Sequence, residues 1–284
     1  MQDRAARIPL IVLLMGLGSI AMLVPAVQAV ILEDFRTMRA FFYGMILFGI
    51  LTLLVGLATA GTRPKNVARS QLLTLFAAFC ILPLMFAVPF AEALGNTSYL
   101  DAWFEMISSF TTTGATLYDT NGRLTPSLHL WRATVGWMGG FMVWVMAVAI
   151  FAPMNLGGFE VRAVGGVGRG TVSYSQVGQV ADPTERLARY TFKLFPIYLG
   201  LTITLWVGLV MMGDVSYVAL CHAMSILSSS GISPIDGVYY AAAGWQGEML
   251  MFVFFMFALS RLTFSKGLMG EADRTKLRHD PEFR

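Results

Sequence analysis

The chain has 284 residues, of which 56% are apolar and only 13% are charged, and its formal net charge is +3. Soluble domains carry about 25% charged residues, so this composition excludes an ordinary soluble globular protein. The small net charge gives no support to nucleic-acid binding. The composition instead indicates an all-α polytopic membrane protein.

Six apolar stretches are long enough to cross a bilayer core, which takes about 20 helical residues. In chain order they are Ile8–Leu32, Ala40–Gly61, Gln71–Phe90, Leu130–Pro153, Thr191–Met212 and Trp245–Phe264. The first stretch also has an interpretation as a signal peptide, because Arg4 and Arg7 precede it and Val27-Gln28-Ala29 offers a small-residue cleavage site. Its length exceeds the roughly 7–15 apolar residues of a signal peptide, which favours a retained helix.

The stretches form an N-terminal transmembrane hairpin, residues 1–70, and then two copies of one unit. The hairpin is joined by Glu33–Arg39. Each unit contains a long helix, a short helix that cannot span, a glycine-containing segment and a second long helix. We predict the first unit at 71–153, a cytoplasmic linker at 154–190, the second unit at 191–264 and a cytoplasmic tail at 265–284.

The two short helices carry their own signals. In the first unit, Ser98 precedes Asp101 by three residues, which predicts a capping box and a helix over Asp101–Phe110. In the second unit the helix is predicted to begin at Asp214 or Ser216 and to end at Leu227. The predicted fold is therefore six transmembrane helices plus two re-entrant pore helix–filter loops.

Lysine and arginine residues are unevenly distributed between alternate connecting segments. Sixteen of the twenty lie in one set, which includes both termini and the linker, and only Arg36, Arg39, Arg123 and Arg132 lie in the other. Cytoplasmic segments carry the excess of basic residues. Both termini are therefore predicted to be cytoplasmic, and residues 99–125 and 216–244 are predicted to face outside.

Two hexamers share one pattern of three hydroxyl residues, a glycine, a small or apolar residue and another hydroxyl. They are Thr111–Thr116 and Ser228–Ser233, called here the hydroxyl–glycine segments, and their glycines at 114 and 231 are 117 positions apart. A single segment of this kind is compatible with an ordinary loop between membrane helices. Two copies in register, each after a short helix on the same face, favour the lining of a pore, where irregular backbone at membrane depth is tolerated.

The dipoles of the short helices favour a cation over an anion in such a pore. A helix C-terminus carries roughly half a negative charge, and each short helix ends at its hydroxyl–glycine segment. Backbone carbonyls in such segments replace the hydration shell of potassium. The candidate ion-binding residues are Thr112, Thr113, Gly114, Ala115, Ser229, Ser230, Gly231 and Ile232.

Four further positions near the first segment have specific expectations. Glu105, within the short helix, is predicted either to accept hydrogen bonds behind the filter or to add negative potential near the cation path. Arg132 follows Trp131 and is expected to form an interfacial anchor with it. Gly136 and Gly140 are spaced for close helix contact, with packing against the pore helix as their expected role.

No catalytic, cofactor or metal-cluster chemistry is indicated by the sequence. The glycine-rich run Gly165–Gly170 lacks the Lys-Ser/Thr ending of a P-loop and is interpreted as a flexible linker. The two cysteines and three histidines have no metal-site or disulfide spacing. The chain is not expected to be an enzyme or to need a cofactor, and the only ion expected is potassium at the filter residues.

The motifs resemble those of a known family. The run Glu105–Thr116 resembles the first pore loop of the Trk-type potassium uptake proteins, and Leu130–Ala133 with Gly136–Gly140 is similar to the helix that follows. Residues Ala219–Ser225 leading to Ser230–Ser233 look like the second pore loop. The resemblance implies four helix–pore-loop–helix repeats around one pore in the cytoplasmic membrane, together with a cytosolic nucleotide-binding regulatory subunit. This chain resembles the N-terminal half only and supplies two repeats.

Two loops leave half of a four-fold filter missing, so three assemblies remain open. In the first, the chain is a half-subunit completed by a complementary half. In the second it forms a homodimer, and in the third it is a truncated product without transport activity. A non-conducting membrane scaffold or regulatory pseudo-subunit is the alternative function. A proton-coupled carrier of another solute is disfavoured, because the long helices lack deep charged residues.

Overall fold

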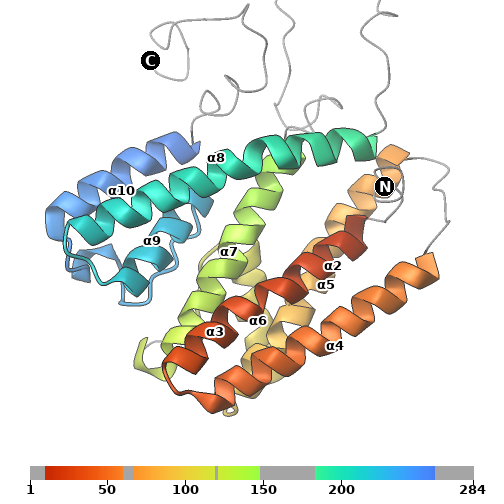
Figure 1. Cartoon of the computed structure of the whole chain (residues 1–284), viewed down its shortest axis with the longest axis horizontal. Coiled ribbons are helices and arrows are strands. Elements are labelled where there is room, and N and C mark those ends of the chain that lie inside the picture. The colour runs from red at the N-terminus through yellow and green to blue at the C-terminus, as the bar shows by residue number, and fades with distance from the viewer. Residues whose placement is uncertain (1–9, 60–66, 119–120, 148–182, 260–284) are drawn as a thin grey trace, which may run out of the picture.

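The structure is a computed structural model of the chain and describes residues 10–59, 67–118, 121–147 and 183–259 (Figure 1). A short 3-10 helix, η1 (Asn121–Arg123), follows the first hydroxyl–glycine segment. Another, η3 (Val238–Tyr240), follows the second hydroxyl–glycine segment. Every regular element in these ranges is a helix. The tail, the glycine-rich run and most of the predicted linker lie outside the described residues.

The N-terminal hairpin consists of α2 (Leu10–Ala21) with α3 (Leu23–Ile31), packed against α4 (Phe35–Thr59). The Ser19 hydroxyl donates to the carbonyl of Met45 at 2.7 Å and ties the two arms together. The second arm begins at Phe35, five residues before the expected Ala40. The reason is Asp34, whose Oδ1 accepts from the amide of Thr37 at 3.1 Å and thereby caps the helix.

The first predicted unit contains α5 (Val67–Leu94), α6 (Tyr99–Phe110) and α7 (Pro126–Met146). The predicted capping box is present, with the Ser98 side chain accepting from the amide of Asp101 at 3.1 Å. Because Ser98 is the cap residue, α6 starts at Tyr99 rather than Asp101. The Tyr99 hydroxyl donates to the Leu84 carbonyl at 2.7 Å, which fixes α6 against α5.

The same order of elements follows in α8 (Pro183–Met211), α9 (Ser216–Ser228) and α10 (Gly244–Leu259). Helix α8 begins eight residues before the expected Thr191, inside the predicted linker, where Pro183 suits the first turn of a helix. Helix α9 begins at Ser216, one of the two predicted starts. Asp214 instead accepts from the amide of Ala242 at 3.0 Å and fastens the chain that enters α10.

Four of the six expected spans are long and apolar enough to cross a membrane: Leu10–Ile31, Phe35–Thr59, Leu73–Leu94 and Arg189–Met211. Helix α10 is shorter as described, and α7 is not among the four. Helix α7 carries the polar side chains of Arg132, His129 and Thr134, and these are buried together with most of the helix. A helix enclosed by protein does not need to present apolar side chains to lipid.

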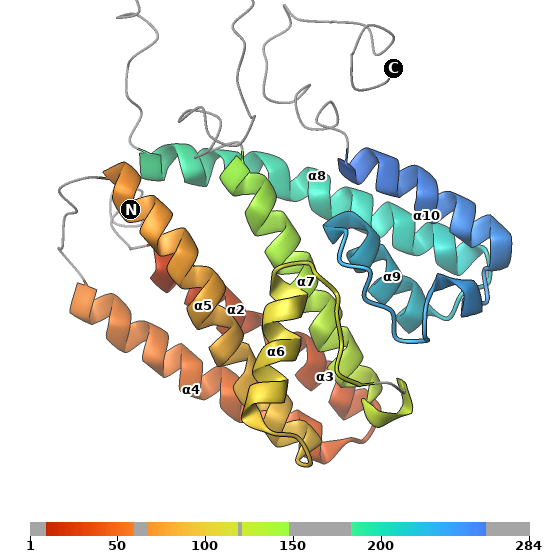
Figure 2. The same ribbon diagram turned by 180° about the vertical axis from the view of Figure 1, so that it is seen from behind.

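Helix α7 occupies the centre of the arrangement. It contacts α6 on one side and α9 on the other, and both views show it between these two short helices (Figures 1 and 2). The indole of Trp131 on α7 is fully buried and donates to the Phe86 carbonyl of α5 at 3.3 Å. On its other face, the Trp137 indole donates to Thr202 of α8 at 3.0 Å. Helix α7 therefore joins the two predicted units.

Candidate ion-conduction site

The first hydroxyl–glycine segment begins as a helix-terminating motif. The amide of Thr113 donates to the Ser108 carbonyl at 2.9 Å, and the amide of Thr112 donates to the Ser109 carbonyl at 3.0 Å. This pair of bonds is a Schellman motif, which needs one residue in the left-handed region. That residue is Thr112, with φ 58°. Threonine is β-branched and unusual in this region, so surrounding contacts must hold it there.

The second segment begins in the same way at the equivalent positions. The amide of Ser230 donates to the Ser225 carbonyl at 3.0 Å, and the amide of Ser229 donates to the Ile226 carbonyl at 3.1 Å. Ser229 takes the left-handed position with φ 54°. Each residue lies 117 positions after its counterpart, the same offset that separates the two glycines.

A helix end explains one left-handed residue, but each segment contains a second. Gly114 has φ 72° and Gly231 has φ 67°, each two residues after the left-handed residue that ends the helix. Alternation of left-handed and ordinary residues turns successive peptide planes, so that neighbouring carbonyls need not point in opposite directions as they do in a strand. Both segments share this alternation, which is suited to presenting several carbonyl oxygens to one ion.

The two segments meet beside α7. A Cβ added to Gly114 would lie 1.9 Å from the carbonyl oxygen of Ser230, so the backbones of the two segments are in direct contact there. Gly136 on α7 faces the last turn of α6 and the second segment, because an added Cβ would lie 3.3 Å from the Ser109 carbonyl and 3.2 Å from the Ser230 hydroxyl. Gly114 and Ser230, which are 116 positions apart in the sequence, are therefore neighbours in space.

Three glycines on α7 admit this close approach. Gly140 faces Ser228, with 2.7 Å between an added Cβ and the serine Cβ, in agreement with the predicted role of Gly136 and Gly140. Gly139 was not assigned a role from sequence, yet an added Cβ there would lie 1.9 Å from the Phe110 carbonyl oxygen. The Gly139-Gly140 pair was the available signal, because adjacent glycines in a helix imply contacts on two sides.

The candidate residues differ in exposure. Thr113, Ala115, Ser229 and Gly231 are exposed, Thr112 and Gly114 are half-buried, and Ser230 and Ile232 are buried. The Ile232 side chain packs with Leu130, Ala133 and Cys221 rather than lining an open surface. Each segment thus has exposed residues on one side, and the buried residues of the second segment pack against α7.

Glu105 and Arg132 form a buried ion pair behind the first segment. Arg132 Nε lies 2.9 Å from Glu105 Oε2, and the two side chains are 5% and 0% exposed. The expectation that Arg132 serves as an interfacial anchor is therefore wrong. The reason is that α7 packs against α3, α6 and α9, and Arg132 lies buried with only 4% of its surface exposed.

The other oxygen of Glu105 holds the end of the first segment. Oε1 accepts from the Thr116 hydroxyl at 2.9 Å and from the amide of Leu117 at 2.6 Å. Of the two expected roles for Glu105, these contacts match hydrogen bonding behind the segment. The charge of Arg132 also offsets the negative potential that Glu105 would otherwise add.

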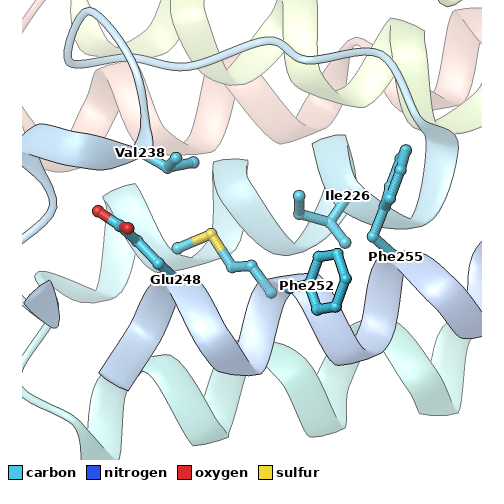
Figure 3. A pocket seen from close by; sticks show the side chains of 6 residues that line it. Ile226, Val238, Glu248, Phe252 and Phe255 are labelled. Atoms are coloured by element: carbon cyan, nitrogen blue, oxygen red, sulfur yellow. The ribbon is translucent and has the colours of Figure 1, made fainter. Parts of the chain in front are cut away.

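Two shallow hollows lie in the described part of the chain. One lies between α9 and α10 and is lined by Ile226, Val238, Glu248, Met251, Phe252 and Phe255 (Figure 3). The other lies between the start of α7 and the chain after the second segment, near Thr125, Tyr217 and Pro234. Within the described residues, no group of His, Cys, Asp and Glu side chains could hold a metal ion.

The fold and the apolar helices define a multi-pass α-helical membrane protein. No family model matches the chain. It is 28% identical over 283 residues to the Trk system potassium uptake protein TrkH of Vibrio parahaemolyticus, covering 96% of this chain and 55% of that protein. It is 27% identical over 226 residues to TrkG of Escherichia coli K12, covering 78% of this chain and 44% of that protein.

The comparison of folds also finds a Trk potassium transporter. The crystal structure of the potassium transporter TrkH from Vibrio parahaemolyticus matches with a TM-score of 0.71 and 26% identity, over 89% of this chain and 49% of that one. The resemblance to Trk-type potassium uptake proteins that the motifs indicated is thereby confirmed. These relatives are potassium uptake proteins rather than enzymes. The chain spans about half the length of the curated relatives it matches.

Proposed function

We propose that this chain forms half of the pore of a Trk-like system for potassium uptake across the cytoplasmic membrane. The observation that carries the proposal is the pair of hydroxyl–glycine segments, which share one alternation of backbone angles and touch at Gly114 and Ser230. In this proposal the filter oxygens are backbone carbonyls of Thr112, Thr113, Gly114 and Ala115 and of Ser229, Ser230, Gly231 and Ile232.

The electrostatics of the described site favour a cation. Helices α6 and α9 both end where the segments begin, so the negative ends of their helix dipoles lie next to the proposed ion path. Arg132, a buried basic residue near the first segment, is paired with Glu105. Carbonyl oxygens that replace a hydration shell are the arrangement used for potassium.

The exposed edge of each segment supports an incomplete pore. Backbone groups of the segments would face lipid in a monomer, and unsatisfied polar groups in hydrocarbon cost several kcal/mol each. We propose that a complementary half-subunit supplies two further loops, with a homodimer as the second arrangement. A cytosolic nucleotide-binding regulatory subunit is proposed by analogy with the family, on the side of the linker and tail.

The proposed domain organisation follows the predicted one: a hairpin, two helix–pore-loop–helix repeats, a cytoplasmic linker and a cytoplasmic tail. Both termini are proposed to be cytoplasmic, on the distribution of basic residues. In that orientation the pore loops enter the membrane from outside, as re-entrant segments between six spans.

The decisive experiment is complementation. The chain is expressed with a matching second half in cells that lack potassium uptake, and growth at low potassium and rubidium influx are measured. We expect rescue by the pair and loss of rescue with Gly114→Ser. Gly122→Ser is the matched control, because Gly122 has open space around it and an ordinary φ. Rescue that survives Gly114→Ser would support a scaffold or pseudo-subunit instead.

A further inference from the structure

Each short helix carries a buried titratable side chain at the same position of the repeat. Glu105 in α6 and His222 in α9 are separated by the 117 positions that also separate the two glycines. Glu105 is fully buried and His222 is 1% exposed. Their chemistry differs, since one is a carboxylate and the other an imidazole, so the equivalence is not visible in the sequence pattern.

Both side chains contact the last hydroxyl of their own segment. Glu105 Oε1 accepts from Thr116 Oγ1 at 2.9 Å, and His222 Nε2 lies 2.9 Å from Ser233 Oγ. Thr116 and Ser233 are again 117 positions apart. The contact therefore spans eleven residues in both units and closes each segment onto its own short helix.

The hydroxyls of Thr116 and Ser233 also accept hydrogen bonds from backbone amides just after each segment. Thr116 Oγ1 accepts from the amide of Tyr118 at 3.2 Å. Ser233 Oγ accepts from the amides of Ile235 and Gly237, both at 3.2 Å. The exit of each segment is thus tied, through one hydroxyl, to a side chain that is fixed in the protein interior.

The hydrogen-bond inventory of Ser233 determines the role of His222. A hydroxyl has one donor hydrogen and two acceptor lone pairs. Two backbone amides occupy the lone pairs, so the hydroxyl must donate to His222, and Nε2 must be an unprotonated acceptor. The neutral ring then carries its hydrogen on Nδ1, which lies 3.9 Å from Asp214 Oδ2.

Asp214 lies near this ring nitrogen, at a distance too long for a hydrogen bond, and it holds a second contact. Its Oδ2 faces His222 Nδ1, and its Oδ1 accepts from the amide of Ala242 at 3.0 Å. Arg132 has the corresponding supporting role in the first unit, because it faces the Glu105 oxygen that Thr116 does not use. Each contact to a segment is therefore backed by a second charged side chain from another element.

We propose that His222, in its neutral form, is a positioning residue that holds the exit of the second filter segment through Ser233, as Glu105 does for the first through Thr116. The inference deepens the proposed function and rests on it, because it assigns His222 a part in ion selectivity. His222 itself would not contact the ion.

The first test does not depend on transport. Amide hydrogen exchange is measured in the purified full chain over residues 229–240. His222→Leu and Ser233→Ala should each increase exchange at Ile235 and Gly237, because the hydroxyl acceptor is lost or no longer held. His222→Gln and Ser233→Thr should retain wild-type protection, since Gln has an oxygen near the Nε2 position and Thr keeps the hydroxyl. Unchanged exchange in both Leu and Ala variants would overturn the proposal.

The second test uses the complementing assembly and measures the ratio of potassium to sodium uptake. His222→Leu and Ser233→Ala should lower this ratio, His222→Gln and Ser233→Thr should restore it, and the Leu/Ala double variant should be no worse than either single one. An equal loss in His222→Gln would show that ring packing matters rather than the hydrogen bond, which also contradicts the proposal. If the wild-type assembly takes up no potassium, the proposed function fails while the exchange result still decides the contact.

Discussion

The backbone of Gly114 lies directly against the carbonyl of Ser230, although the two residues belong to different units of the chain. A single added carbon at Gly114 would fall 1.9 Å from that oxygen, whereas the space around Gly231 is open to beyond 4 Å. The two glycines of the repeated motif thus have the same backbone angle and different surroundings.

This difference predicts unequal effects of alanine at the two positions. Gly231→Ala should cost about 1–2 kcal/mol in unfolding free energy, from the left-handed φ alone. Gly114→Ala should cost more, because it combines that strain with a clash against backbone. Denaturant unfolding of the purified chain in micelles measures both, with Gly122→Ala as the control. Equal losses for the two glycines would mean that the segments do not touch.

The Glu105–Arg132 pair predicts a strong dependence of stability on both partners. Arg132→Met should destabilise the chain by about 3–5 kcal/mol, because it leaves the Glu105 charge buried and unpaired. Adding Glu105→Gln should recover much of this loss, since the amide oxygen still accepts from Thr116 and no charge remains. Melting temperatures of the two single variants and the double variant test this ordering. A double variant less stable than Arg132→Met would contradict the pairing.

The distribution of basic residues predicts which segments are accessible from outside. Cysteine introduced at Asn121 or Asp236 should react with an impermeant thiol reagent in intact cells. Cysteine at Arg169 or Lys276 should react only after permeabilisation. The native Cys80 and Cys221 are replaced by serine or alanine in the background. Labelling at Arg169 in intact cells would reverse the orientation and place the hydroxyl–glycine segments on the cytoplasmic face.

The open edges of the segments predict that a monomer conducts no potassium selectively. The chain is purified alone, its mass in detergent is measured, and potassium flux is followed after reconstitution. Flux only with a complementary half, or only from a dimer, is the expected result and identifies the assembly. Selective flux from a demonstrated monomer would be incompatible with a pore that needs four loops.

Local chemistry determined much of this protein in advance. Helical membrane architecture follows from long apolar runs, because a bilayer leaves backbone groups no partner except the helix itself. The start of α6 follows from Ser98 and Asp101, which are three residues apart and act on their own turn. The equivalence of the two hydroxyl–glycine segments could also be predicted from the sequence, since the same residue pattern recurs 117 positions along the chain.

Contacts between elements that are distant in the sequence could be identified only from the tertiary structure. Arg132 reads as an interfacial residue beside Trp131, and only the packing of α7 between α6 and α9 brings it to Glu105. His222 reads as a lone histidine in an apolar helix, and only the return of the chain after Gly231 places Ser233 beside it. The Glu105–Arg132 and His222–Ser233 contacts form only when the elements that carry these residues pack together. Sequence spacing fixes which residues share a helix face, but it does not fix which face of another element they meet.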